Sequence, residues 1–164
     1  KLGFVDELQV TEKGRIALPL FVHTIFLTEL IHRGQLDDAS PIQLARLAAS
    51  LMWERSQNLP VLPADPWLLE VEVIRDTIAR RAGLVPEELA VFAHAAAVPM
   101  ALWYEKKPLD HVLQRSQMEP GDFVQLVRRS LDLLQQVQGA APHLKDTIQN
   151  AISRLDRDVV RFRG

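Results

Sequence analysis

The segment spanning residues 119–137 reads Glu-Pro-Gly-Asp-Phe-Val-Gln-Leu-Val-Arg-Arg-Ser-Leu-Asp-Leu-Leu-Gln-Gln-Val, and the rest of the chain is organised around it. Pro120 suits an early helical position and Asp122 places negative charge in the first turn, so a helix is expected to begin here. Its apolar residues are too numerous for one narrow stripe: they are Phe123, Val124, Leu126, Val127, Leu131, Leu133, Leu134 and Val137. A helix of this kind is surrounded by protein on most sides.

Two charged motifs stand out against this apolar background. Arg128 and Arg129 are adjacent in the middle of the apolar helix, where each guanidinium requires a carboxylate, a phosphate or access to water. The residues alone favour salt bridges or solvent exposure for this pair. The motif Trp53-Glu54-Arg55 ends another apolar helix just before a proline-rich loop. Taken alone, it indicates a helix C-terminus at which Arg55 interacts with the last carbonyls.

Apolar residues at helical spacing fill most of the chain, and strand signals are confined to its beginning. The predicted helices are joined by short connections and one proline-rich loop, at residues 58–66; their ranges are 19–33, 40–55, 67–81, 86–103 with a bend near Pro99, 109–117, 119–137 and 142–160. In the helix at 67–81, the residues expected to face the core are Leu69, Val73, Ile74 and Ile78.

The first residues differ in character from the rest. Residues 2–18 are predicted to form two short β-type pieces around Asp6-Glu7 and a brief helix that Thr11 caps and Gly14 ends. The sequence therefore predicts an all-α fold. It consists of a bundle of about six to seven helices at residues 19–164 and a small irregular or β-like N-terminal appendage at residues 1–18.

Composition limits the classes of function. The 164 residues are 48% hydrophobic with a formal net charge of −2, as in an ordinary globular domain. Near-neutral charge argues against strong non-specific binding to nucleic acid or to anionic membranes. The scattered basic residues Lys106, Lys107, Arg115, Arg154, Arg157, Arg161 and Arg163 are typical of a solvated face. No apolar run reaches membrane-spanning length, and the absence of cysteine favours a reducing, cytoplasmic location.

The motifs of a self-sufficient enzyme are missing from the sequence. The glycines form neither a dinucleotide-binding nor a phosphate-binding loop, and the histidines lack metal-ligand spacing with an acidic partner. No nucleophile elbow of the Gly-x-Ser-x-Gly type occurs. We therefore expect no catalytic residue, no cofactor site and no metal site in this chain.

Six short blocks of sequence occur in a recognisable order. They are Val10–Ala17, Leu27–Ile31 with Gly34, Ser40-Pro41 with Leu44, Ala45 and Leu47, Trp53-Glu54-Arg55, Trp103, and Gly121–Val124 with Arg128-Arg129. Together they resemble the C-terminal helical (DSHCT) domain of superkiller-like, exosome-associated DExH-box RNA helicases and of their bacterial and plastid relatives. The chain departs from that pattern at Gln125, where the family often has arginine, and at Pro120, where it usually has glutamate.

The resemblance implies a parent protein that is an ATP-dependent 3′-to-5′ RNA helicase acting in RNA unwinding and processing. ATP and Mg²⁺ would bind its RecA-like motor domains, upstream of this chain, and the fragment alone would be inactive. This domain would brace the motor and line the RNA channel, with single-stranded RNA as ligand, RNA-degrading nucleases as further partners and no membrane contact. Arg129, Glu54 and Arg128 would face the RNA. Alternatively, Glu54 and Arg129 pair with each other across the bundle.

A second function class remains open at this stage. The chain could be a free-standing helical protein-interaction module with no role for RNA, which binds a partner through Trp103-Tyr104 or Leu20-Phe21. A small hydrolase is a third option and ranks last, because the sequence contains no catalytic constellation.

Overall fold

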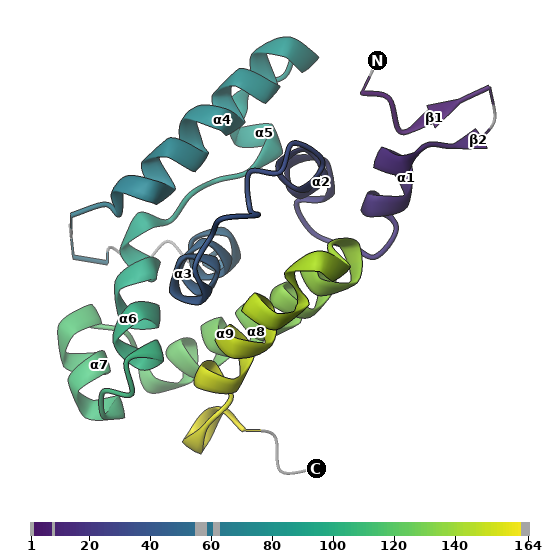
Figure 1. Ribbon diagram of the computed structural model, residues 1–164. Helices are drawn as coiled ribbons and strands as arrows, with labels where there is room; N and C mark the ends of the chain where they lie inside the picture. Colours follow the sequence, from purple (N-terminus) through teal and green to yellow (C-terminus); the bar gives the residue numbers. More distant parts are fainter. Residues whose placement is uncertain (1, 8, 55–58, 61–62, 162–164) are drawn as a thin grey trace.

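The computed structural model describes residues 2–7, 9–54, 59–60 and 63–161. Within these ranges the chain forms nine α-helices and one two-stranded ribbon, which confirms the all-α prediction (Figure 1). The helices are α1 Glu12–Ala17, α2 Thr24–His32, α3 Pro41–Met52, α4 Pro66–Ala82, α5 Pro86–Leu89, α6 His94–Tyr104, α7 Leu109–Ser116, α8 Pro120–Ala140 and α9 Lys145–Leu155. The remaining elements are the strands β1 Val5–Asp6 and β2 Gln9–Val10 and the 3-10 turns η1 Pro142–Leu144 and η2 Asp158–Val160.

The number of helices agrees with the predicted number when the two shortest helices are left out. Helix α1 belongs to the N-terminal appendage, and α5 has only four residues. Seven longer helices remain in the described part of the chain, at the upper end of the predicted six to seven. None of the described helices is long and apolar enough to cross a bilayer.

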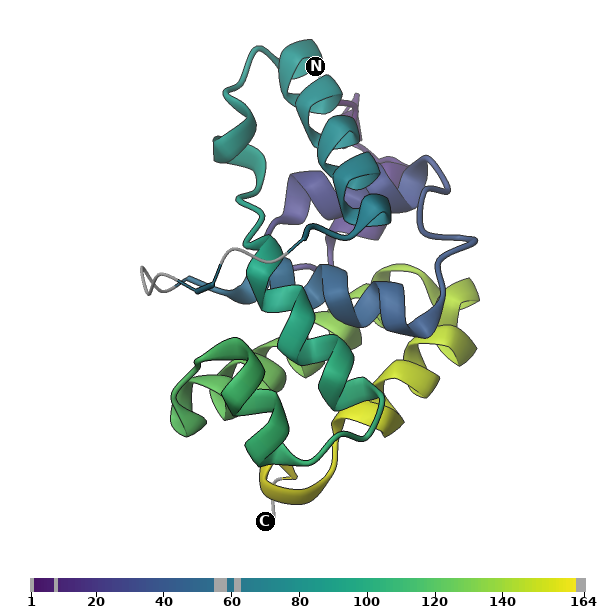
Figure 2. The same ribbon diagram turned by 90° about the vertical axis from the view of Figure 1, so that its left-hand side faces the viewer.

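Helix α3 lies at the centre of the bundle. It packs against α6 on one side and against α8 and α9 on the other, and Figures 1 and 2 show it enclosed between these helices. Ser40 and Gln43 start α3 with a capping box, followed by proline at the first helical position, as the Ser-Pro pair predicts. Alanines at 45, 48 and 49 are buried on α3, and their small side chains let the neighbouring helices approach closely.

The prediction that protein surrounds α8 on most sides holds only in part, because Gln125, Arg128 and Asp132 lie on an exposed face of the helix. Its buried residues are Asp122, Phe123, Leu126, Val127, Ser130, Leu133, Leu134, Val137 and Ala140. They form one broad face, against which α3 and α9 both pack. Leu47 of α3 and Leu133 of α8 line the same small void between the two helices, so this part of α8 packs against the centre of the bundle.

The N-terminal appendage is a tight unit around Gly14. Strands β1 and β2 pair antiparallel, and the hydroxyl of Thr11 accepts a hydrogen bond from the N–H of Gly14 at 3.1 Å, as a helix cap does. The prediction that Gly14 ends this helix is wrong, because Gly14 lies inside α1. A Cβ atom at this position would collide with the carbonyl oxygen of Phe4. Gly14 therefore allows the ribbon to pack onto α1.

A buried carboxylate joins the appendage to the bundle. Glu29 of α2 is 2% exposed and forms ion pairs with Lys13 of α1 and with Arg33, whose Nε lies 2.9 Å from the carboxylate. Burial raises the pKa of Glu29, but the hydrogen bonds and charges of Lys13 and Arg33 outweigh it and hold the pKa below its usual 4.5. The boundary proposed between residues 18 and 19 stays a prediction.

Three predicted helices differ in the structure. The last, expected over 142–160, is an α-helix only from Lys145 to Leu155, with a 3-10 turn on either side. The helix expected from residue 19 begins at Thr24, because His23 has a left-handed backbone conformation with φ of 48°. The single helix expected over 86–103 is interrupted after Leu89. The interruption is stabilised by tertiary hydrogen bonds: the N–H of Ala93 donates to the carbonyl of Ser50, and the guanidinium of Arg75 donates to the carbonyl of Ala90.

Helix α4 buries only part of the predicted face: Ile78 is buried and Ile74 packs against the core, as predicted, but the other two residues are exposed. Leu69 and Val73 are exposed at 45% and 64%, whereas Leu68, Val71, Arg75, Ile78 and Ala79 are buried. Arg75 can be buried because its guanidinium contacts the carboxylates of Glu72 and Asp76. Gly83 ends α4 in the left-handed conformation, with φ of 71°, as the sequence predicts.

Candidate functional site

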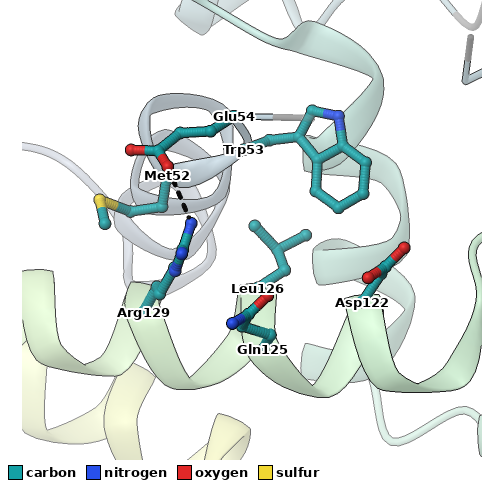
Figure 3. Close-up of a pocket in the computed structure, with 7 residues that line it drawn as sticks. All are labelled: Met52, Trp53, Glu54, Asp122, Gln125, Leu126 and Arg129. Carbon is teal, nitrogen blue, oxygen red and sulfur yellow. Dashed lines mark hydrogen bonds and ion pairs between the residues drawn. The ribbon is translucent and has the colours of Figure 1, made fainter. Parts of the chain in front are cut away.

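Arg129 and Glu54 come together on the surface of the bundle. Nη1 of Arg129 on α8 lies 3.0 Å from Oε2 of Glu54, which follows α3 and is 75 residues away in sequence (Figure 3). The side chains are 40% and 71% exposed. An ion pair this exposed contributes about 0–1 kcal/mol to stability, so both groups can exchange this contact for another at little cost.

The end of α3 positions Glu54. Trp53 caps the helix with an extended backbone, and its N–H still donates to the carbonyl of Ala49 at 3.2 Å. The chain therefore leaves the helix axis immediately before Glu54. Because α3 packs on α8, this exit point lies beside the middle of α8, where Arg129 stands.

A hollow of about 280 Å³ extends from the ion pair along α8. It is lined by the end of α3 and by one face of α8, namely Met52, Trp53, Glu54, Asp122, Gln125, Leu126 and Arg129. The α8 residues follow the i, i+3, i+4, i+7 spacing of a single helix face. Figure 3 shows the Arg129–Glu54 pair at one end of the hollow, the indole of Trp53 above Asp122 at the other, and Leu126 between them. Arg55, the third residue of the charged motif, lies outside the described residues.

Arg128 faces a different part of the surface. Its Nε donates to the carbonyl of Val160 at 3.3 Å, and it lines a separate hollow of about 380 Å³ between α8 and the C-terminal elements. Neighbouring helical residues point about 100° apart, so the two arginine side chains leave α8 in different directions. Of the three predicted RNA-facing residues, the structure brings together Arg129 and Glu54 and places Arg128 elsewhere.

Trp103 belongs to the core, so the prediction that it contributes an exposed apolar face is wrong. Its side chain is fully buried, its Nε1–H donates to the carbonyl of Leu155 at 2.9 Å, and its ring packs edge-on against Phe123. The guanidinium of Arg157 stacks over the indole at 3.4 Å and donates to the carbonyls of Trp103 and Lys107. Arg157 therefore has a packing role rather than a place on the predicted solvated face, and Arg163 lies outside the described residues.

The other apolar pair named from the sequence is divided by the structure. Leu20 is buried at 4%, whereas Phe21 is 80% exposed. Tyr104 is partly buried, and its hydroxyl donates to the side-chain oxygen of Asn150 at 3.1 Å. Phe21 is thus the one residue among these that presents a large apolar surface.

Sequence reasoning missed a second polar cluster. Arg75 contacts Glu72, whose other carboxylate oxygen lies 2.7 Å from Nε2 of His94, and the Arg75 guanidinium lies 5.4 Å from the ring centre of Phe92. The i, i+3 spacing of Glu72 and Arg75 in the sequence indicates that the two side chains can pair on one helix face, but the contact with His94 depends on the tertiary fold. Within the described ranges, no three His, Asp or Glu side chains are grouped so that they could hold a metal ion.

Comparison with known proteins shows the family of this chain. The sequence model of the DSHCT (NUC185) domain matches residues 7–163, and the chain belongs to this family, as the six sequence blocks indicate. The chain is also similar to the DExH-box ATP-dependent RNA helicase DExH9 of Arabidopsis thaliana, with 24% identity. That match covers 98% of this chain but only 18% of the plant helicase, so the chain spans under a fifth of this relative's length.

Proposed function

We propose that this chain is the C-terminal accessory domain of an ATP-dependent 3′-to-5′ RNA helicase, where it lines the channel for single-stranded RNA and braces the motor domains. The exposed Arg129–Glu54 pair carries the proposal, because it places two groups suited to RNA on a rigid face of a DSHCT domain. The similarity to a protein named as an RNA helicase supports the choice of RNA as ligand.

The two side chains would contact RNA in different ways. The guanidinium of Arg129 can donate to a phosphate or stack on a base, and the carboxylate of Glu54 can accept from the amino group of a base. RNA would compete for both groups with their mutual ion pair, which is weak because it is exposed. Contacts held on the rigid α8 would resist backward slipping of the strand while the motor domains cycle.

The domain would depend on the rest of the helicase for affinity and for chemistry. Its net charge of −2 gives little attraction for a polyanion, so the other channel walls would supply most of the positive charge. ATP and Mg²⁺ would bind the motor domains, because this sequence has no phosphate-binding loop. RNA-degrading nucleases are expected to act on the strand that the helicase delivers.

The test is an unwinding and RNA-stimulated ATPase assay of the complete helicase with the Arg129→Ala substitution. Loss of one hydrogen bond to a charged group corresponds to about 1.5–3 kcal/mol, so RNA affinity should fall roughly tenfold to a hundredfold. Thermal unfolding should change little, since the exposed ion pair contributes at most about 1 kcal/mol. Arg81→Ala is the matched control: Arg81 is an exposed arginine in the last turn of α4.

The outcomes separate a channel wall from a structural element. Reduced RNA-stimulated activity at unchanged stability, with a normal Arg81→Ala variant, supports the proposal. Equal losses of thermal stability and activity for Arg129→Ala would overturn it, because the arginine would then act through folding.

A protein-interaction module is the second candidate, and one observation favours it. Phe21 and Leu18, in the segment between α1 and α2, are 80% and 69% exposed. If this surface were the functional one, Phe21→Ser would abolish partner binding, while Arg129→Ala would leave every activity unchanged. Unchanged partner binding by Phe21→Ser would remove this candidate.

A further inference from the structure

Trp53 is a partly buried aromatic residue at the border of two hollows. It lines the 280 Å³ hollow beside α8 and also a second one of about 480 Å³, whose other walls include Val91 and Phe92. Within the described residues its indole N–H donates no hydrogen bond, whereas that of Trp103 is bonded to a backbone carbonyl. The side chain of Trp103 is therefore fully buried and hydrogen-bonded in the core, whereas part of the Trp53 side chain remains accessible to a ligand.

The walls of the hollow offer both apolar and polar groups to a base. Its described walls carry two carboxylates, Glu54 and Asp122, and one guanidinium, Arg129. A nucleobase is neutral and flat, and it would find the indole and the apolar side chain of Leu126 together with the polar amide of Gln125.

The size of the hollow fits one base. Its volume of about 280 Å³ lies just below the range of roughly 300–1,000 Å³ that is typical of small-molecule pockets. Asp122 and Arg129 are seven residues apart, which is about 10 Å along α8. Stacked rings have centres about 4.5–7 Å apart, so a base stacked on Trp53 would lie in the hollow that Arg129 and Glu54 also line.

We infer that the indole of Trp53 is a stacking platform for one base of single-stranded RNA, next to the Arg129–Glu54 pair. The inference rests on the proposed function and adds a base-binding residue to it. Stacking would be independent of sequence, because every base has an aromatic face. It would hold the base while Arg129 releases Glu54 and contacts the adjoining backbone.

The experiment measures binding of the complete helicase to two labelled strands, a single-stranded RNA and an abasic strand of the same length. The abasic strand keeps the sugars and phosphates but lacks the bases. The variants are Trp53→Leu, Trp53→Tyr and Arg129→Ala. Trp67→Leu is the matched control, because Trp67 is also a partly buried tryptophan packed against the core, but on α4.

Base stacking predicts that Trp53→Leu weakens RNA binding about fivefold to 150-fold and that Trp53→Tyr retains most of the affinity. On the abasic strand, Trp53→Leu should bind as the wild type does, since no base is left to stack. Trp67→Leu should behave as the wild type on both strands.

A purely structural role for Trp53 would lower affinity equally for both strands, and that result would overturn the inference. If Arg129→Ala weakens RNA binding and Trp53→Leu does not, the stacking inference fails while the proposed function stands. If neither substitution affects RNA binding, the proposed function fails as well.

Discussion

Replacing Glu29 by glutamine removes the buried carboxylate that joins α1 to α2. Glu29 is 2% exposed, and its partners are Lys13 of the appendage and Arg33, the residue that follows α2. Removing one partner of a fully buried ion pair costs about 3–5 kcal/mol, and a hydrogen bond to a charged group contributes about 1.5–3 kcal/mol. Because both cations are partly exposed and glutamine can still accept one hydrogen bond, we expect a loss of about 2–3 kcal/mol.

The loss should depend on pH in a defined direction. The folded-state pKa of Glu29 is held below 4.5, so its ionised form stabilises the fold above the unfolded-state pKa. That contribution disappears as the pH falls through the folded-state pKa. The stability difference between wild type and Glu29→Gln should therefore be full at about pH 7 and should narrow below about pH 4.5.

Urea unfolding followed by circular dichroism, repeated from about pH 7 to about pH 3, measures this difference. Near neutral pH, about 2–3 kcal/mol corresponds to a melting temperature lowered by roughly 4–12 °C in a domain of this size. Glu70→Gln, at an exposed position on α4, is the control and should stay within about 0.5 kcal/mol of wild type. A Glu29→Gln variant as stable as wild type, or a stability difference that does not vary with pH, would show that the charge of Glu29 does not stabilise the fold.

Further predictions concern packing. Gly14→Ala should destabilise the chain by about 1–3 kcal/mol in thermal unfolding, because the added methyl group meets the Phe4 carbonyl. Gly121→Ala, where a Cβ atom meets nothing, should be neutral or stabilising; equal effects of the two substitutions would contradict this account. Arg157→Ala should cost about 2–3 kcal/mol in urea unfolding, because it removes the guanidinium stacked on Trp103 and two hydrogen bonds to carbonyls. A loss below about 0.5 kcal/mol would show that this arginine is dispensable for packing.

Signals confined to a few neighbouring residues predicted much of the fold. The Ser40-Pro41 cap, the Gly83 stop and the apolar pattern of α8 each depend on local backbone chemistry, and each agrees with the structure. The burial of α4 could not be predicted in this way. Leu69 has the more apolar side chain, but Arg75 is the buried residue. The carboxylate of Glu72 compensates the charge of Arg75, and the carbonyl of Ala90 accepts a hydrogen bond from its guanidinium.

The remaining errors have tertiary causes. A glycine in a short helix indicates a helix end locally, and only the approach of Phe4 explains why Gly14 lies within α1. The break between α5 and α6 depends on hydrogen bonds to Ser50 and Arg75, both far away in sequence. Likewise, only the packing of α3 on α8 shows how Trp53 frames a hollow beside Arg129.

The candidate site was predictable only in part. Family resemblance singled out Arg129 and Glu54, and the structure brings their side chains together. It also singled out Arg128, which the periodicity of a helix necessarily directs away from its neighbour. The roles of these residues toward RNA stay predictions.

The proposal that Arg129 and Glu54 bind RNA can be tested by fluorescence anisotropy. A labelled single-stranded RNA is titrated with the complete helicase, at low and at moderate salt. The account predicts tight binding by the wild type and a roughly tenfold to hundredfold weaker binding by Arg129→Ala, with a loss for Glu54→Ala as well. It also predicts that the isolated domain binds poorly, given its net charge of −2. Equal RNA affinity of the helicase with and without both side chains would contradict the account and would leave the domain a structural brace.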